Sequence, residues 1–368
     1  MMNVIVIGGD HHNTLGVIRS LGEKGIQSEA LITSPDLKTF AGCSRYVKKL
    51  HVVPYPKDIV PYMLAYLIQK EKSIVICCHD AAASEIDVHL EELRPFFVLP
   101  GSVEQGHITR LMDKKVMSEL ALQCGLSIPE TFYPLKLPIH ADDVALPCIV
   151  KPLVSKNGTK NDIRICHHIN EVNESVAHIG KENVQIQQFI DKDFEYQLIG
   201  CSTGGDVIIP GVSRIIRPCK GSNTSFLHYE PFEEGFCEIE KCKNYVKRTD
   251  YKGLFSLEFL RDRDGRDYFM EINFRNDGNA ICVTSAGVNL PYIWYLSCMN
   301  QDYQMEASKP ISPVYVMPDL AEIKLLLNRE INIIQFVGDF VKTNRFMEFD
   351  RKDMKPFWKM IAQKLKIK

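Results

Sequence analysis

The chain has 368 residues, of which 45% are hydrophobic and 24% charged, and this composition excludes a protein that is disordered throughout. The formal net charge of −2 argues against a general electrostatic attraction to nucleic acid. No apolar run approaches the ~20 residues that cross a bilayer, and the first residues do not resemble a signal peptide. We expect a cytoplasmic protein of two or three domains with no transmembrane segment.

The first hundred residues alternate between strand-like and helix-like segments. Residues 3–7 form a β-branched run that ends at Gly8 and Gly9, and a stretch with helical apolar spacing follows. Further strands are expected at these positions: 28–32, 73–78 and 96–100. The alternation predicts a parallel sheet with Rossmann-like winding.

The loop after the first strand, residues 10–13, lies where such folds bind nucleotides. The glycines around it do not form G-x-G-x-x-G, so a simple polar turn is the favoured interpretation. A substrate site near this loop stays open as the alternative.

From about residue 101 the pattern changes to α+β. Residues 107–126 have helical spacing, and the strand 146–152 ends with Lys151. A polar loop at 153–162 precedes the remaining elements, for which we expect a strand at 162–166, a helix at 171–179 and a strand at 184–190. Gly204-Gly205 then joins two strands of a hairpin.

The clearest hairpin has Asp264-Gly265 at its turn, and it carries Glu258 in one strand and Glu271 and Asn273 in the other. Residues two apart in a strand share a face, so Glu271 and Asn273 point the same way. Two carboxylates and an amide oxygen are hard ligands that suit Mg²⁺ or Mn²⁺. The alternative is a surface hairpin whose polar face is simply solvated.

This hairpin resembles the metal-binding hairpin of the ATP-grasp superfamily, Glu followed by Glu-x-Asn-x-Arg. The resemblance extends over residues 105–300 and includes further parts in the family's order. It implies a Rossmann-like N-terminal domain followed by the two α+β subdomains of an ATP-grasp fold. The expected domains are residues 1–104, 105–186 (the first, lid-bearing subdomain), 187–305 (the second subdomain, with the hairpin) and 306–368 (a C-terminal extension).

The resemblance also implies where ATP binds. The nucleotide-binding residues expected from it are Lys114, Lys151, Gln187, Gln188, Phe189, Ile190 and Glu195, with the lid residues Ser155 and Lys156. Relatives often have a glycine-rich lid, whereas the loop 153–162 has one glycine, so these two lid residues would contact phosphate through their side chains or be solvated. Relatives often carry an acidic residue at the position of Gln187, and a glutamine oxygen can accept the same hydrogen bond.

Basic residues are the candidates for binding the substrate carboxylate or the acylphosphate. Arg275 follows the hairpin ligands, and Arg214, Arg217 and Lys220 lie in a second strand-like segment. The alternative for these last three is a set of ordinary surface charges. Arg275 is the preferred candidate because its position aims it at the metal.

The resemblance implies a carboxylate–amine ligase that uses ATP and Mg²⁺ (or Mn²⁺) and forms an amide, acting on an amino acid, a peptide or a cell-envelope precursor. Two alternatives stay open: a carbamoyl-phosphate synthase-like reaction, and a regulatory module that binds nucleotide without turnover. The expected partners are a small carboxylate and an amine, no nucleic acid, and possible homodimerisation. The basic C-terminal helix would either pack on the protein or touch an anionic membrane, and the first is favoured.

The cysteines form the last pattern. Of the twelve, Cys77 and Cys78 are adjacent and the others are scattered, many of them in apolar runs, and no C-x-x-C occurs. We expect reduced, buried thiols rather than a zinc site.

Overall fold

A computed structural model describes residues 2–134, 136–152, 163–180, 184–218, 225–233 and 235–365. The chain forms two compact units. Unit 1 consists of Met1–Thr109, Gln197–Leu257 and Asn273–Lys368, and unit 2 consists of Arg110–Tyr196 and Glu258–Ile272. The four-domain division expected from the sequence stays a prediction.

Unit 1 begins with a parallel sheet. Its strands are β1 (Val4–Gly9), β2 (Ser28–Thr33), β3 (Val47–Val53), β4 (Ser73–Cys77) and β5 (Phe97–Val98), in the order β3-β2-β1-β4-β5. The helices between them are α1 (His12–Gly22), α2 (Ile59–Tyr66), α3 (Asp80–Val88) and α4 (Leu90–Leu93). All four strand pairs are parallel, so the Rossmann-like prediction is confirmed.

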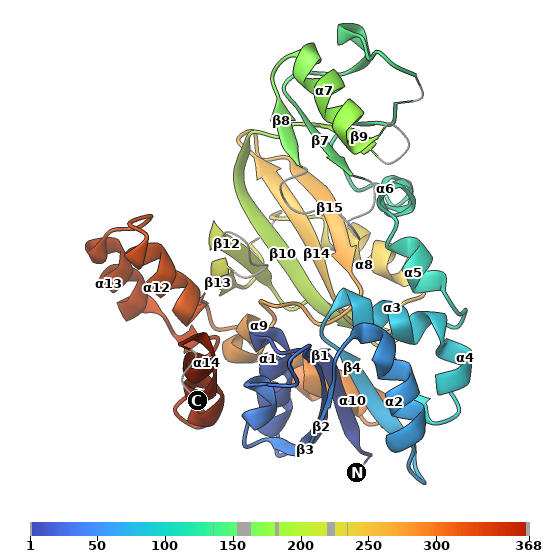
Figure 1. The fold of residues 1–368 in the computed structure, drawn as a ribbon, viewed down its shortest axis with the longest axis vertical. Helices are drawn as coiled ribbons and strands as arrows, with labels where there is room; N and C mark the ends of the chain where they lie inside the picture. Colours follow the sequence, from blue (N-terminus) through green and yellow to red (C-terminus); the bar gives the residue numbers. More distant parts are fainter. Residues whose placement is uncertain are drawn as a thin grey trace. The chain divides into compact units, whose positions relative to one another are not determined.

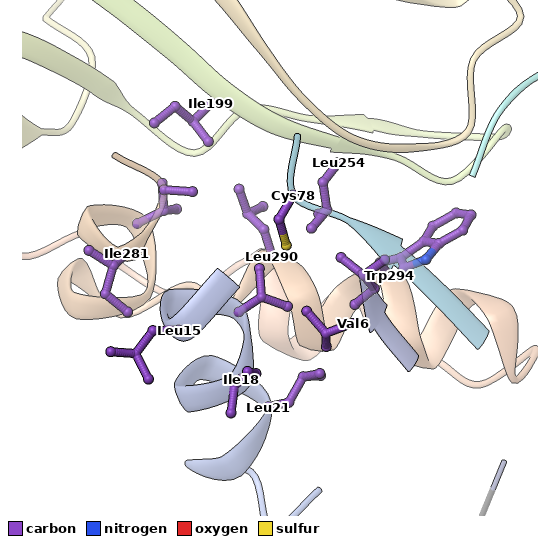
Figure 2. Close-up of a cluster of buried hydrophobic side chains, with 14 of the residues drawn as sticks. Val6, Leu15, Ile18, Leu21, Cys78, Ile199, Leu254, Ile281, Leu290 and Trp294 are labelled. Carbon is purple, nitrogen blue, oxygen red and sulfur yellow. The ribbon is translucent and has the colours of Figure 1, made fainter. Parts of the chain in front are cut away.

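The central strand β1 is buried on both faces, as expected for a parallel sheet covered by helices. Its alternate residues enter two different cores: Ile5 and Ile7 pack towards α2 and α3, and Val4 and Val6 pack towards α1. Figure 2 shows the second core, in which Leu15 and Ile18 of α1 and Val6 meet residues from distant parts of the chain. Among these are Ile281 of α9 (Ile281–Ala286) and Trp294 of α10 (Leu290–Cys298).

A larger sheet has the strand order β15-β14-β10-β12-β13-β16-β17, with β11 pairing to β10. Its strands are β10 (Lys192–Ser202), β11 (Val207–Ile208), β12 (Val212–Pro218), β13 (Ser225–Glu230), β14 (Gly253–Asp262), β15 (Asp267–Asn273), β16 (Val314–Met317) and β17 (Arg345–Phe346). Strands β10 and β11 pair antiparallel, Cys201 opposite Ile208, which confirms the predicted hairpin at Gly204-Gly205. Figure 1 shows β10, β14 and β15 as long neighbouring strands.

Unit 2 contains a four-stranded antiparallel sheet in the order β6-β9-β7-β8. Its strands are β6 (Thr131–Phe132), β7 (Cys148–Pro152), β8 (Arg164–Cys166) and β9 (Val184–Gln188), and helix α7 (Ile169–Ile179) covers one face. Val150 of β7, Ile186 of β9 and Val176 of α7 are buried together in one hydrophobic cluster. Residues next to them in sequence, such as Lys151 and Gln187, therefore point to the other face of the sheet.

The helix predicted at 107–126 is two helices, α5 (His107–Leu111) and α6 (Lys114–Gln123). The break occurs because Asp113 caps α6, where its carboxylate accepts from the backbone N–H groups of Lys115 and Val116. The prediction of one continuous helix is therefore wrong. The break leaves Lys114 as the first residue of a helix.

The remaining helices are α8 (Ile239–Arg248), α11 (Gln304–Ala307), α12 (Asp319–Leu327), α13 (Ile333–Lys342) and α14 (Met354–Lys364). Helix α14 is the predicted basic C-terminal helix. It buries Met360 in the core of unit 1, with Phe357 packed against the same core. This is the favoured one of the two arrangements expected for this helix, and a contact with lipid stays a prediction.

In the part of the chain that the structure describes, no helix is both long and apolar enough to cross a membrane.

None of the described cysteines is in a disulfide, and most are buried. Burial raises the pKa of the Cys77 thiol to about 12, so this thiol is protonated at neutral pH.

Candidate active site

The face of the small sheet in unit 2 that lies opposite α7 carries a chain of polar side chains. Nζ of Lys151 in β7 donates to Oε1 of Gln187 in β9 at 2.8 Å, and Nε2 of Gln187 donates to Oγ1 of Thr131 in β6 at 3.1 Å. The strands place these residues side by side, because Gln187 pairs with Thr131 on one side and with Ile149 on the other. The side chain of Gln187 therefore fixes the position of the Lys151 ammonium.

Lys151 is electrostatically linked to two other predicted site residues. Burial and, to a smaller extent, the positive charge of Lys114 lower the pKa of Lys151 to about 8, and the carboxylate of Glu271 opposes both. Three residues far apart in sequence are therefore close enough to interact within unit 2. Two ammonium groups next to a carboxylate are the groups needed to hold a phosphate chain and its metal ion.

The predicted adenine-binding segment is held by backbone hydrogen bonds. The N–H of Gln188 donates to the carbonyl of Glu130 at 2.8 Å, and that of Phe189 donates to Pro147 at 3.2 Å. Ile190 is buried, and Glu195 is ion-paired with Lys192. The segment is therefore rigid up to Phe189. Its contacts with adenine stay a prediction.

The hairpin β14–β15 has the turn that the sequence predicted. The N–H of Asp262 donates to the carbonyl of Arg266 at 3.0 Å, and Gly265 has φ of 81°, a conformation that favours glycine. The rings of Phe259 and Phe269 pack edge to face across the two strands. Glu258 and Glu271, one in each strand, are both half-buried.

The burial alternation of β15 is interrupted at the predicted ligand. Phe269 and Ile272 are both buried although they are three residues apart, and Glu271 lies between them. The N–H of Ile272 donates to Sδ of Met117 at 3.4 Å. Phe269 and Ile272 lie on opposite faces of the strand, so both faces are covered on either side of Glu271.

In unit 1, Arg275 lies at the centre of a buried polar network. Its guanidinium donates to Asp80 at 3.1 Å, to Asp277 at 3.0 Å and to Oδ1 of Asn273 at 2.9 Å. Asp277 in turn accepts from Ser256. The sequence identified Arg275 and Asn273, but it did not identify Asp80, whose only signal was its position directly after the fourth strand of the parallel sheet.

The loops at the carboxyl ends of β1 and β4 also contain residues without a predicted role. Nδ1 of His79 accepts from the N–H of Ala82, so its Nε2 carries the proton and can donate to Thr33 at 3.0 Å. Burial lowers the pKa of His79, so the ring is neutral at pH 7. Nδ1 of His11 caps α1 by accepting from Asn13. Both ring nitrogens of His79 are therefore engaged in hydrogen bonds, and the charge of Arg275 also lowers the pKa of His79.

The structure pairs the other two predicted arginines with acidic residues. Arg214 forms an ion pair with Glu230 at 2.6 Å, and Arg217 contacts Glu322 at 2.5 Å and Asp339 at 2.8 Å. Arg217 thereby joins Glu322 and Asp339 within unit 1. A role of Arg214 or Arg217 towards substrate stays a prediction. Ser155, Lys156 and Lys220 lie outside the described residues.

The predicted metal ligands fit a hard cation by their chemistry. Glu258 and Glu271 supply carboxylate oxygens, and Oδ1 of Asn273 keeps a second lone pair besides the one that accepts from Arg275. Within the described ranges no cluster of three or more His, Cys, Asp or Glu could hold a metal. The predicted set has two carboxylates and one amide, so it is not a cluster of this kind, and its binding of a metal stays a prediction.

A Rossmann-like sheet, a small antiparallel sheet with two lysines beside it, and a carboxylate-bearing hairpin are the parts of an ATP-grasp fold. No family model and no curated relative matches the chain. Solved structures do match, and three of them are described here by name. An L-amino acid ligase from Bacillus licheniformis has a TM-score of 0.64 at 16% identity, over 86% of this chain and 80% of that one.

A carboxyaminoimidazole ribonucleotide synthase from Aspergillus clavatus, complexed with ATP, has a TM-score of 0.63 at 13% identity, over 86% of this chain and 82% of that one. A biotin carboxylase from Campylobacter jejuni has a TM-score of 0.62 at 12% identity, over 83% of this chain and 72% of that one. The chain therefore has the fold of the ATP-grasp superfamily, which confirms the fold predicted from the sequence.

Proposed function

We propose that this protein is an ATP-dependent carboxylate–amine ligase. It would phosphorylate a carboxylate with ATP, releasing ADP, and an amine would then displace phosphate from the acylphosphate to form an amide. The observation that carries the proposal is the electrostatic link of Lys151, Lys114 and Glu271 at the small sheet of unit 2. The ATP-grasp fold supports it independently.

Each part of the site has a role in this reaction. Lys151 and Lys114 bind the phosphates of ATP, and the segment from Gln187 to Ile190 receives the adenine. Glu258, Glu271 and Asn273 would hold Mg²⁺, which when bound neutralises charge on the β- and γ-phosphates. Phosphoryl transfer depends on such positioning and charge neutralisation more than on covalent chemistry by the protein.

The substrates of this ligase would bind in unit 1, around Arg275. Its guanidinium is oriented by Asp80 and Asp277, and it donates a hydrogen bond to Asn273, two residues earlier in the chain. We infer that it stabilises the charge that develops on the acyl phosphate group. Amino acids are the first substrates to test, because one of the matching structures is an L-amino acid ligase.

The proposal is tested by phosphate release from Mg-ATP across a matrix of carboxylates and amines, with mass spectrometry of each positive sample. We expect release that requires both an acid and an amine and that gives an amide product. Release with bicarbonate and ammonia alone would favour carbamate phosphorylation instead. ATP binding without turnover across amino acids, peptides and lipid-linked acids would contradict the ligase and favour a regulatory module.

The pKa of Lys151 predicts how ATP binding depends on pH. Because that pKa is about 8 instead of the usual 10.5, the free lysine loses its charge as the pH rises through 8. Bound phosphate favours the charged form, so binding above pH 8 requires proton uptake. We expect the affinity for ATP to fall about tenfold between pH 7 and pH 9, because the charged fraction of a lysine with a pKa of about 8 falls by about that factor over this range.

Isothermal titration calorimetry in buffers of different ionisation enthalpy measures both the affinity and the proton uptake. The variant Lys151→Arg, whose charge persists at pH 9, is expected to lose this pH dependence. Lys115→Arg serves as the matched control, because Lys115 is exposed and directly follows Lys114 in the sequence. This variant should bind ATP with the same pH dependence as the parent protein. An affinity that does not change from pH 7 to pH 9 in the parent protein would contradict this prediction.

A further inference from the structure

The helical hairpin formed by α12 and α13 in unit 1 has an unusual distribution of burial. Its buried residues include two acids, Glu322 with 0% exposure and Asp339 with 6%. Its exposed residues are largely aliphatic, which is the reverse of the arrangement expected for helices on a protein surface in contact with water. Figure 1 shows the two helices side by side at the left of the view.

The buried acids fix the hairpin to the large sheet. Arg217 of β12 donates through Nε and Nη2 to Glu322, and through Nη2 to Asp339 at 2.8 Å. Nζ of Lys342 reaches the other oxygen of Asp339 at 2.7 Å. Removing either acid would leave Arg217 incompletely paired in a largely buried position, so these contacts determine which face of the hairpin turns inward.

The opposite face, which we call the outer face, consists of apolar residues. They are Ile323 and Leu327 of α12 with Ile333, Ile334, Val337, Phe340 and Val341 of α13. Ile334 is 82% exposed, Val341 78% and Leu327 76%. Ile334 and Val341 are seven residues apart, so they lie on one side of α13, two turns from each other.

The outer face is large enough for a specific protein interface. The exposed fractions correspond to roughly 700 Å² of surface, close to the ~800 Å² that each partner contributes to a standard interface. The largest apolar patch of a typical monomer is only about 300–600 Å². Gly338 lies in the same exposed stretch of α13 and has open space beside it, which permits another helix to approach closely.

We propose that the outer face binds the outer face of a second copy of the same chain. Two helical hairpins packed face to face form a four-helix arrangement, and a two-fold axis brings identical patches together. The area favours this occupant, since both copies supply ~700 Å² and the total reaches the standard size. The proposal is independent of the ligase reaction, because none of the predicted site residues lies on this face.

The test is the mass of the full-length protein in solution, measured by sedimentation velocity over a range of micromolar concentrations. We expect a dimer for the parent protein and a monomer for Ile334→Glu/Val341→Glu, which places four carboxylates in the symmetric interface. Both side chains are exposed, so we expect an unchanged circular dichroism spectrum and midpoint of thermal unfolding. The single variant Ile334→Glu should raise the dissociation constant by at least about tenfold.

The matched control is Met305→Glu, which adds the same charge at an 81% exposed apolar residue of α11 and should remain dimeric. A parent protein that is monomeric at all concentrations would overturn the proposal, as would a double variant that remains a dimer. Binding of the monomeric parent to phosphatidylserine vesicles, lost in the double variant, would also overturn it in favour of a membrane. Hydrogen exchange of residues 333–341 in the parent provides a second test without any variant: protection that rises with concentration is expected, and constant protection contradicts the dimer.

Discussion

Replacing Glu271 with glutamine is expected to reduce phosphate release by about a hundredfold to a thousandfold, the size of effect seen when one group that stabilises charge in the transition state is lost. Glutamine keeps the size and one oxygen of the side chain, but it removes the negative charge that a divalent cation requires. The same change removes the carboxylate that opposes the lowering of the Lys151 pKa, so this pKa should fall further. Turnover is measured by phosphate release at saturating Mg-ATP and substrates.

ATP binding separates loss of chemistry from loss of folding in this variant. In the absence of magnesium we expect Glu271→Gln to bind ATP at least as well as the parent protein, because one negative charge near the phosphates is gone. Asp264→Asn removes a charge from the exposed turn of the same hairpin and should leave turnover unchanged. A Glu271→Gln variant with nearly normal turnover would contradict the proposed metal site.

The second large effect is on stability, for Arg19→Met in α1. Arg19 is 1% exposed, and its guanidinium donates to the carboxylate of Asp353 at 3.0 Å and to the backbone carbonyls of Met347 and Glu348. Methionine fills similar space but leaves Asp353 as a buried charge with no cationic partner. Removing one partner of a buried ion pair costs about 3–5 kcal/mol of unfolding free energy.

Urea denaturation followed by circular dichroism measures this effect. Arg351→Met, at an exposed position in the same C-terminal segment, should change the unfolding free energy by less than about 0.5 kcal/mol. The double variant Arg19→Met/Asp353→Leu should be more stable than Arg19→Met alone, because replacing both partners removes the unpaired charge. If Arg19→Met lowers the free energy of unfolding by less than about 1 kcal/mol, α1 and the C-terminal segment are not held together by this contact.

These contacts explain why the C-terminal segment packs as it does. Ser44 also donates to Asp353, and the N–H of Arg45 donates to its other oxygen. One buried carboxylate therefore connects α1, the segment after β2 and the residue that precedes α14. The sequence predicted a basic helix here, with packing as the favoured arrangement. It gave no indication that the anchor is Asp353, a residue outside the helix.

Local patterns were sufficient for the elements and for several site residues. The β-branched run at 3–7 and the strands that follow predicted the parallel sheet, because strands buried on both faces need continuous apolar residues. Asp264-Gly265 predicted the turn of the hairpin, since glycine readily adopts the positive φ found there. Such signals depend on neighbouring residues only, so they can be read in a single chain.

The sequence by itself therefore determined the order of the elements, the ATP-grasp fold and the positions of Lys151, Glu271 and Arg275. The tertiary structure decided which of their neighbours engage them. Arg217 pairs with Glu322, 105 residues away, and Arg275 pairs with Asp80, 195 residues away. No local pattern encodes such pairs, because they depend on which distant segments the folded core brings together. The same reason makes the pKa of Lys151 and the outward apolar face of α13 properties of the fold and not of the local sequence.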